Sequence, residues 1–349
     1  MPLFTGSKFG FGKDAAGDAG PAPGQPFSAS GGDVTPAGIT PGNGYTYHVF
    51  TSSGTFTLTG NPADIEVLLV AGGGGGGNPL SAGGGAGGVV HAILSFDPGP
   101  HAITIGDGGF GAPQTCPSPG PAGAKGGDST MAGHPLGTIT AEGGGGGGPY
   151  DGTVPAPSLA DMSGGSGGGA RTYSPPYQYG VGNQPTLNPA FTPNPTFNQY
   201  GNPGGRSPNY PGPSPTMITD PQGNAGGGAG AAGNTVEYEG GAGQPFPGFA
   251  SPLISPQIPG PVQPSWIPEV GASGYYGGGG GAGCRDSSSG SRTGGAGGGA
   301  NGNSSGGGNA ATNYTGGGGS AGSYSTGGGG GEPNKGGVGI CVIRYIAIP

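Results

Sequence analysis

The sequence predicts a mostly β and irregular fold, in which a small antiparallel β-sandwich roots a bundle of polyglycine II helices, with essentially no α-helix. Three observations predict it. Glycine-dominated tracts recur between residues 72 and 331, short apolar segments with strand patterning flank them, and no stretch has the apolar spacing of an amphipathic helix. The chain of 349 residues holds 95 Gly and 40 Pro, so backbone must supply much of its packing.

The composition argues for order despite this glycine content. Aperiodic Gly and Pro at such a level usually indicate a disordered segment. However, disordered chains are usually rich in charge, and only 7% of these residues are charged. With 30% hydrophobic residues, a large side-chain core is excluded. We therefore expect an ordered chain in which glycine backbones pack directly against each other.

Charge and hydropathy exclude two classes of partner. The formal net charge is −8 and there is no basic run, so nucleic-acid binding through phosphate neutralisation is not expected. The longest apolar stretches, residues 65–71 and 338–348, do not approach the roughly 20 residues of a membrane span, so no membrane insertion is expected. Met1 is not followed by a basic segment and then an apolar one, as in a secretory signal peptide. We therefore expect the protein to be made and assembled in a cytoplasm.

The apolar segments read as strands. Residues 45–50 alternate in polarity, and residues 52–54 supply a turn into a second strand over 55–59. Residues 65–70 are a continuous apolar run, as expected of a strand buried on both faces. Further strands are predicted at residues 89–94, 101–105, 139–141 and 338–345. The sandwich strands therefore fall within residues 45–142 and 338–346, and the last one comes from the C-terminal end.

The glycine tracts between residues 72 and 331 fit the extended threefold polyproline II conformation. That conformation rises about 3.1 Å per residue without internal hydrogen bonds. Its N–H and C=O groups must therefore find partners in neighbouring tracts. Interruptions such as Ala86, Ser166 and Ala296 are small, and we expect them where a tract faces outward or meets the sandwich. Collagen is excluded because there is no strict Gly-X-Y repeat, and calcium-binding nonapeptide repeats because no Asp recurs.

A leader over residues 1–42 precedes the glycine-rich domain, which we place at residues 43–349. The leader spaces its aromatic residues among Gly, Pro, Ala and Asp without helix or strand periodicity. Such rings can fill pockets on another surface, which makes the leader a candidate docking segment. The alternative, a segment folded back onto its own domain, remains open. The candidate docking residues are Phe4, Phe9, Phe11 and Phe27.

The sequence IEVLLVAGGGGGG at residues 65–77 resembles the strand-to-polyglycine entry of glycine-rich domains in bacteriophage structural proteins. Similar domains occur in the tip adhesins of long tail fibres, where polyglycine helices present variable loops to the host surface. Members are common in phages of marine bacteria, including cyanobacteria. The resemblance covers about residues 44–345, and two proline-rich insertions, 149–222 and 244–276, depart from it. Matching segments follow in the family's order at residues 83–94, 102–109, 139–148 and 337–345.

No residue pattern points to enzymatic chemistry, metal or cofactor. The four histidines fall in separate strands or turns without ligand spacing, and Cys116, Cys284 and Cys341 read as free thiols. Residues 106–111 have the GxGxxG form of a dinucleotide turn, but a proline-rich segment follows where a helix would have to begin. We therefore expect a protein that is not an enzyme and binds no cofactor.

The two insertions carry most of the remaining aromatic residues, set among Pro, Asn and Gln. Rings on proline-stiffened loops lose little entropy on binding, which suits recognition of glycans or of outer-membrane protein loops. The alternative is that the rings cover the glycine bundle, which has no side chains of its own. The candidate host-contact residues are Tyr173, Tyr177, Tyr179, Phe191, Phe197, Tyr200, Tyr210 and Trp266.

The residues and the resemblance together favour a phage virion protein, assembled in the host cytoplasm. Its leader would dock onto another virion component of the tail or capsid, and its loops would contact the host surface as a tail-fibre or tail-tip adhesin. A capsid decoration or head-fibre protein without specific receptor binding is the alternative. A third class, a glycine-rich ice-binding or wall protein, would need a regular threonine-rich face, which the sequence does not have.

Overall fold

The strand-forming segments make two five-stranded antiparallel sheets in the computed structural model. Their strand orders are β1-β3-β6-β7-β8 and β2-β12-β4-β5-β9. The structure describes residues 27–77, 81–113, 122–149, 159–170, 179–206, 223–235, 237–283, 292–303, 307–322 and 334–347. The strands are β1 Phe27–Ser30, β2 Tyr45–Phe50, β3 Gly54–Gly60, β4 Ala63–Val70, β5 Val89–Phe96, β6 Gly99–Thr104, β7 Ser129–His134, β8 Gly137–Ala141, β9 Phe197–Tyr200 and β12 Ile340–Ile346.

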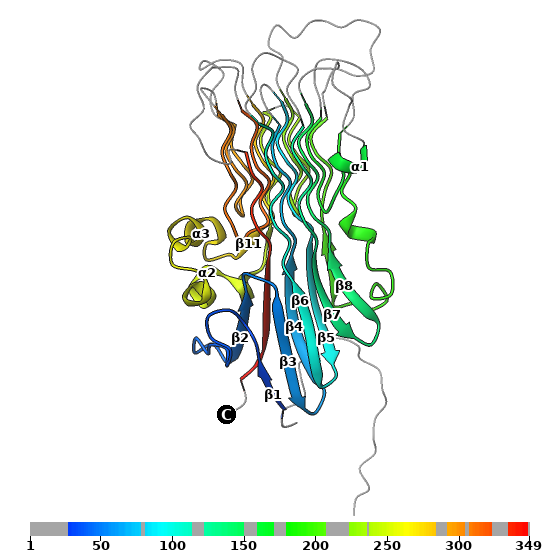
Figure 1. Ribbon diagram of the computed structural model, residues 1–349, viewed down its shortest axis with the longest axis vertical. Helices are drawn as coiled ribbons and strands as arrows, with labels where there is room; N and C mark the ends of the chain where they lie inside the picture. The colour runs from blue at the N-terminus through cyan, green and yellow to red at the C-terminus, as the bar shows by residue number, and fades with distance from the viewer. Residues whose placement is uncertain are drawn as a thin grey trace, which may run out of the picture.

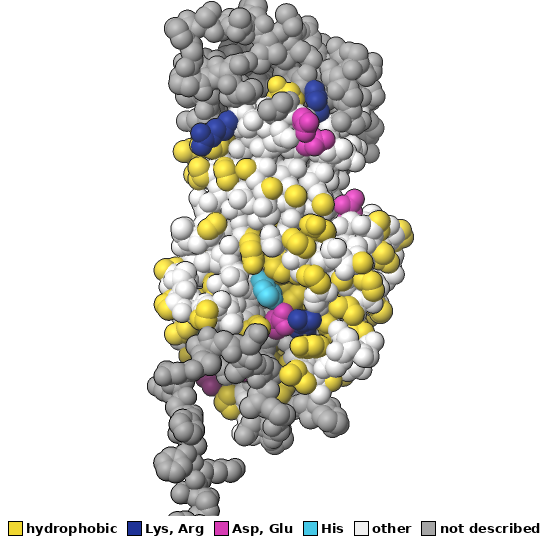
Figure 2. Space-filling view, turned by 180° about the vertical axis from the view of Figure 1, so that it is seen from behind, with side chains coloured by type: hydrophobic (Ala, Val, Ile, Leu, Met, Phe, Trp, Pro, Cys, Tyr) yellow, Lys and Arg dark blue, Asp and Glu magenta, His cyan; other side chains and the backbone are white. Residues whose placement is uncertain are grey.

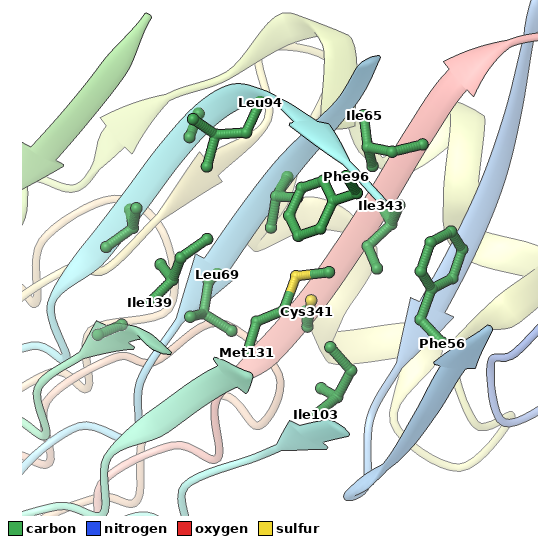
Figure 3. Close-up of a cluster of buried hydrophobic side chains, with 14 of the residues drawn as sticks. Phe56, Ile65, Leu69, Leu94, Phe96, Ile103, Met131, Ile139, Cys341 and Ile343 are labelled. Atoms are coloured by element: carbon green, nitrogen blue, oxygen red, sulfur yellow. The ribbon is translucent and has the colours of Figure 1, made fainter. Parts of the chain in front are cut away.

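The two sheets enclose one hydrophobic core. Phe56 and Met131 of the first sheet lie in the same buried cluster as Leu69 and Ile343 of the second (Figure 3). The C-terminal strand β12 pairs with both β2 and β4, so the two ends of the domain meet in one sheet. The predicted β-rich fold is confirmed. Three of its strands were not predicted: β1 and β9 lie outside residues 45–142 and 338–346, and β7 lies within that range at residues where no strand was expected.

Strand β4 is buried on both faces, which is the cause of its continuous apolar run. Leu69 points into the core between the sheets, whereas its neighbours Leu68 and Val70 belong to a second cluster on the outer face. That outer cluster includes Phe249 and Trp266, which the second insertion supplies. The insertion therefore covers the outer face of the second sheet.

The helices of the described residues are few and short, as expected from the absence of helical periodicity. They are α1 Leu159–Met162, α2 Ser251–Ile254 and α3 Gln263–Val270, with single 3-10 turns at η1 Gln184–Thr186, η2 Pro247–Phe249 and η3 Ser255–Gln257. Helix α3 has Pro in its first turn and Pro268 inside it, so its pattern is too short and interrupted to read as a helix. A two-residue ribbon, β10 Gln244–Pro245 with β11 Tyr275–Tyr276, closes the insertion at its base.

The glycine tracts extend from the sandwich along the long axis of the molecule, side by side (Figure 1). Residues 72–77 form one central tract, and their N–H groups donate to three neighbouring segments in strict rotation. Successive N–H groups of this tract therefore point to three different neighbours in turn, and the pattern repeats every three residues. The bonds, 2.8–3.0 Å long, run from Gly72 to Gly127, Gly73 to Gly337, Gly74 to Gly85, Gly75 to Ala124, Gly76 to Asn334 and Gly77 to Ala82.

Three further segments donate to the carbonyl oxygens of the same tract, so it has six hydrogen-bonded neighbours. These donors are Gly109 and Ala112, Gly144 and Gly147, and Gly319 and Gly322. The adjacent tract, residues 81–88, also has six: it donates to segments 142–148, 224–227 and 316–319, and accepts from 71–77, 166–169 and 280–283. Almost every peptide group of these two tracts is thereby satisfied without secondary structure of the usual kinds.

This packing leaves no room for a β-carbon at most of the inner glycine positions. A Cβ added at Gly74 would lie 2.6 Å from the carbonyl carbon of Gly145, and closer still to its oxygen. Of the three small interruptions, Ala296 is exposed as expected. Ala86 is fully buried but lies three residues before β5, where the tract meets the sheet. Ser166 is buried inside the bundle, and its hydroxyl accepts a hydrogen bond from the Asn202 N–H at 3.4 Å.

Candidate functional site

The end of the glycine bundle opposite the sandwich, here called the distal end, is the candidate site. Backbone hydrogen bonds tie the last residues of many tracts into one layer at this end. Gly77 donates to Ala82 at 3.0 Å, and Ala82 donates to Gly148 at 3.1 Å. The same layer contains Ser81, Gly169, Asn224, Gly283 and Gly322. Figure 1 shows the tracts running to this end from the sheets.

Much of the chain outside the described residues begins and ends at this layer. Residues 171–178 lie between Ala170 and Tyr179, and the Gly180 N–H after them donates to the Gly168 carbonyl oxygen before them at 2.9 Å. Residues 207–222 lie between Arg206 and Gly223. The Gly205 N–H before this segment donates to the Ala225 carbonyl oxygen after it at 2.8 Å. The two ends of each segment therefore lie on neighbouring tracts. The bundle gives these segments a common, hydrogen-bonded base.

Three cation–aromatic pairs surround the distal end, and we call these six residues the distal rim. The guanidinium carbon of Arg206 lies 4.4 Å from the ring centroid of Tyr179, and that of Arg292 lies 5.1 Å from the ring of Tyr238. The ammonium nitrogen of Lys335 lies 5.0 Å from the ring of Phe110, a residue that is 62% exposed. In the space-filling view, basic and acidic side chains likewise gather near this end (Figure 2).

The predicted host-contact residues divide into three groups. Tyr179 is half-buried and lies in the distal rim, and Tyr200, in β9, is half-buried against Phe246 with ring centroids 5.5 Å apart. Tyr173, Tyr177 and Tyr210 lie outside the described residues. The third group, Phe191, Phe197 and Trp266, is buried.

The buried rings serve the fold and do not face a partner, which corrects their assignment as contacts. Phe191 and Phe197 stack at 4.9 Å and join the core between the sheets. Trp266 is fully buried, and its Nε1–H donates to the Tyr314 carbonyl oxygen at 3.0 Å. A chain with so few apolar residues gains more from burying these rings than from exposing them.

The predicted docking residues are described only at Phe27. Phe27 opens β1, pairs in register with Gly60 of β3, and packs edge-on against Tyr345 at 5.1 Å. Residues 27–30 therefore belong to the sandwich, which is the alternative that the sequence left open for this part of the leader. Phe4, Phe9 and Phe11 lie outside the described residues.

A polar clamp fastens the second insertion to the outer face of the sandwich. Arg344 of β12 binds both carboxylate oxygens of Glu66 of β4, at 2.7 and 2.9 Å, and donates to the Gly248 carbonyl oxygen at 3.0 Å. His91 of β5 also bonds to Glu66, at 2.9 Å. Burial acts to raise the pKa of Glu66, but the hydrogen bonds from His91 and Arg344 outweigh it and hold that pKa below its ordinary value.

The other titratable candidates are engaged in packing. His48 lies between the Gly31 carbonyl oxygen, 2.7 Å from Nδ1, and the Tyr345 hydroxyl, 3.0 Å from Nε2; burial lowers its pKa. Burial raises the pKa of the Cys341 thiol, which is fully enclosed. Residues 106–111 form part of a glycine tract rather than a turn into a helix. Within the described ranges, no group of three His, Cys, Asp or Glu is placed to hold a metal ion, and no helix could cross a membrane.

Comparison with known families gives one match. A family described as a glycine-rich domain matches residues 51–346, which include every strand of the two sheets except β1 and β2, and the whole bundle. A search of curated proteins found no match. The matched range ends with β12, the strand at which the two ends of the domain meet.

Proposed function

Because this chain belongs to the glycine-rich domain family, we propose that it is a non-enzymatic structural protein of a bacteriophage virion, acting as a tail-fibre or tail-tip adhesin. The observation that carries the proposal is the common base of the insertion segments at the distal end. Residues 171–178 and 207–222 begin and end on tracts of the bundle, far from the sandwich. Loops held on a rigid base bind with a smaller entropic cost than loops on a mobile one.

The bundle suits this role because its tracts resist bending away from the long axis of the molecule. Each inner tract is bound to six neighbours, so bending one requires breaking peptide hydrogen bonds to the others. A protein that must hold a contact surface away from a particle benefits from such a spacer. The partners we propose are a host surface glycan or an outer-membrane protein at the distal end.

The opposite end supplies the attachment. Strand β1 begins at Phe27 in the sandwich, and residues 1–26 precede it. We place the contact with other virion proteins in those residues, which include Phe4, Phe9 and Phe11. Attachment and host contact would then lie at the two ends of the long axis.

The test shortens the two tyrosine-containing segments in assembled particles. Residues 171–178 and 207–222 are each replaced by a Gly-Ser linker of about four residues, which is long enough to join neighbouring tracts. The matched control replaces residues 323–333, which also start and end at the distal layer but carry one tyrosine, whereas the two shortened segments together lose three. We expect normal particles with adsorption reduced at least about tenfold, and normal adsorption in the control. Unchanged adsorption in the shortened particles refutes the adhesin; unstable heads with normal adsorption indicate a capsid decoration.

A further inference from the structure

We propose that Lys125 and Asn183 form an intramolecular isopeptide bond, with Glu142 as the catalytic group that moves the protons. Such a bond is independent of the proposed adhesin role, because it lies where the bundle meets the sandwich and not at the distal end. Lys125 comes shortly before β7, and Glu142 directly follows β8. The three side chains meet at one carboxylate oxygen.

The shared atom is Oε1 of Glu142. It accepts a hydrogen bond from Lys125 Nζ at 2.5 Å and another from Asn183 Nδ2 at 3.3 Å. An amine, a carboxamide and a carboxyl group that can carry protons between them are the parts needed to exchange one amide for another. Here all three are within hydrogen-bond distance of a single oxygen.

Backbone hydrogen bonds fix the positions of Lys125 and Glu142. The Gly126 N–H donates to the Gly144 carbonyl oxygen at 2.8 Å, which joins the two segments that carry these residues. The Glu142 carbonyl oxygen accepts the Gly88 N–H at 2.8 Å, so this residue is also tied to the tract of residues 81–88. The bundle therefore sets the place of the carboxyl group, which reduces the entropy to be lost in the reaction.

Asn183 is held by its backbone while its side chain faces Glu142. The Asn183 N–H donates to the Gly164 carbonyl oxygen at 2.7 Å, and Oε1 of Gln184, the next residue, accepts the Glu142 N–H at 2.6 Å. Asn183 also precedes the η1 turn, a position at which asparagine commonly caps a helical turn with its side chain. Within the described residues it makes no such cap, and its carboxamide donates to Glu142 instead.

The surroundings of Glu142 suit a carboxyl group that takes up a proton. Its side chain is 13% exposed, and its second oxygen, Oε2, is buried with no hydrogen-bond partner among the described residues. An ionised oxygen left unpaired in this way is costly, and protonation of the carboxyl group lowers that cost. The Lys125 ammonium is the adjacent proton donor, and loss of its proton leaves a neutral amine that can attack.

The reaction balances without an oxidant, a reductant or a second substrate. The Lys125 ammonium gives one proton to the Glu142 carboxylate, and Nζ attacks the carbonyl carbon, Cγ, of Asn183. The Nζ–Cγ bond forms and the Cγ–Nδ2 bond breaks, while Glu142 passes its proton to the leaving Nδ2. Glu142 then takes the second proton that Nζ loses and gives it to the released ammonia. The products are a Lys125–Asn183 amide and an ammonium ion, and Glu142 ends ionised as it began.

The bond would join two segments that lie 58 positions apart in the chain. A covalent cross-link stabilises a fold largely by restricting the unfolded chain, as a disulfide does. It would also fasten the segment that leads into η1 to the first sheet, whose edge strand β8 ends at Ala141, next to Glu142.

The experiment measures the mass of the purified, denatured full chain and maps its tryptic peptides. We expect the mass to be lower than that of the sequence by one molecule of ammonia, with Met1 either retained or removed. Trypsin should fail to cleave after Lys125, and should leave residues 14–171 joined to residues 172–206. A succinimide at Asn43 or Asn301, each of which precedes Gly, causes the same loss of mass, but it does not join these peptides.

Three variants each remove one participant: Lys125→Arg, Glu142→Gln and Asn183→Ala. Each should have the full mass of its own sequence and should be cleaved by trypsin at position 125. The matched control is Lys335→Arg, which should keep both the loss of mass and the joined peptides. Circular dichroism establishes that each variant is folded. A parent chain of full mass that is cleaved after Lys125 overturns the inference without reference to any variant. Joined peptides in Glu142→Gln overturn the role of its carboxyl group.

Discussion

The close packing around the inner glycines predicts that Gly84→Ala is strongly destabilising. Gly84 lies in the tract of residues 81–88, its N–H donates to Gly319 at 2.9 Å, and its carbonyl oxygen accepts from Gly280 at 2.9 Å. An added Cβ would lie 2.6 Å from the carbonyl carbon of Gly74, whereas ordinary contacts begin at 3.4 Å. The Gly74 carbonyl oxygen would lie closer still, so the Gly74 peptide would have to move by at least about 0.8 Å.

The cost of that movement follows from the bonds that Gly74 makes. Its N–H donates to Gly85 at 2.8 Å, and its carbonyl oxygen accepts from Gly319 at 2.9 Å. A shift of about 0.8 Å stretches both past the length at which they count as hydrogen bonds. A buried peptide group left unpaired costs about 1–3 kcal/mol, so the two together cost about 2–6 kcal/mol. Domains are stable by about 5–15 kcal/mol, so the loss is large.

Scanning calorimetry measures the effect, and we expect the midpoint of thermal unfolding to fall by on the order of 10 °C. The control is Gly260→Ala, because a Cβ at Gly260 would have nothing within 4 Å and its backbone angle is ordinary. That variant should match the parent or gain slightly, by about 0.4–1 kcal/mol. Equal midpoints for the two variants would show that the tracts are loosely packed, and would refute the close packing described above.

Three further predictions concern the sandwich and the second insertion. Glu66 has a pKa below its ordinary value of 4.5, so the ionised carboxylate stabilises the fold fully above pH 4.5, and this stabilisation is lost as the pH falls through the folded-state pKa. In Glu66→Gln, the free energy of unfolding measured with urea should therefore decline less between neutral pH and pH 3. Arg344→Met leaves the Glu66 carboxylate partly buried without its bidentate partner, and should lower the free energy of unfolding measured with urea by about 3–5 kcal/mol. A decrease under about 1 kcal/mol would show that water replaces the guanidinium. Trp266→Ala empties a fully buried site and should cost about 3–5 kcal/mol, with limited proteolysis confined to residues 244–276; cleavage spread over the bundle would contradict this.

Local pattern was sufficient to predict the sandwich and the tracts. Strand β4 was predicted to be buried on both faces because it is apolar from Val67 to Val70, and in the structure these side chains alternate between two apolar clusters. The tracts are recognisable in the sequence because most inner positions are packed too closely for any residue but glycine. The first and last strands of the predicted sandwich, β2 and β12, are hydrogen-bonded neighbours.

The insertions could not be predicted in the same way, because their structure depends on distant partners. Strand β9 exists because Phe197 meets Ala92 of β5, a pairing between residues more than 100 positions apart. An aromatic residue on a polar, proline-rich segment can contact a binding partner or pack in the core. The sequence does not distinguish the two roles, because the residue against which the ring packs is far away along the chain.

Helix α3 likewise depends on bonds to residues far along the chain, since Pro268 interrupts it and its own propensity is low. The Trp266 indole donates to the Tyr314 carbonyl oxygen, 48 positions away. In the last turn, Oε2 of Glu269 accepts the Gly298 N–H at 3.2 Å, which ties the helix to a turn of the glycine bundle 29 positions away. No local pattern could have indicated either bond.

The threefold repeat of the tracts also determines where side chains can act. In an edge tract such as residues 106–113, two positions of every three face neighbouring backbone, and the third faces solvent. Asp107, Phe110 and Pro113 occupy that third position and are exposed, whereas Gly108 and Gly109 are buried. A bundle interior without side chains has nothing with which to recognise a ligand. Recognition must therefore come from outward positions of edge tracts and from the ends of tracts, and Phe110 with Lys335 belongs to both.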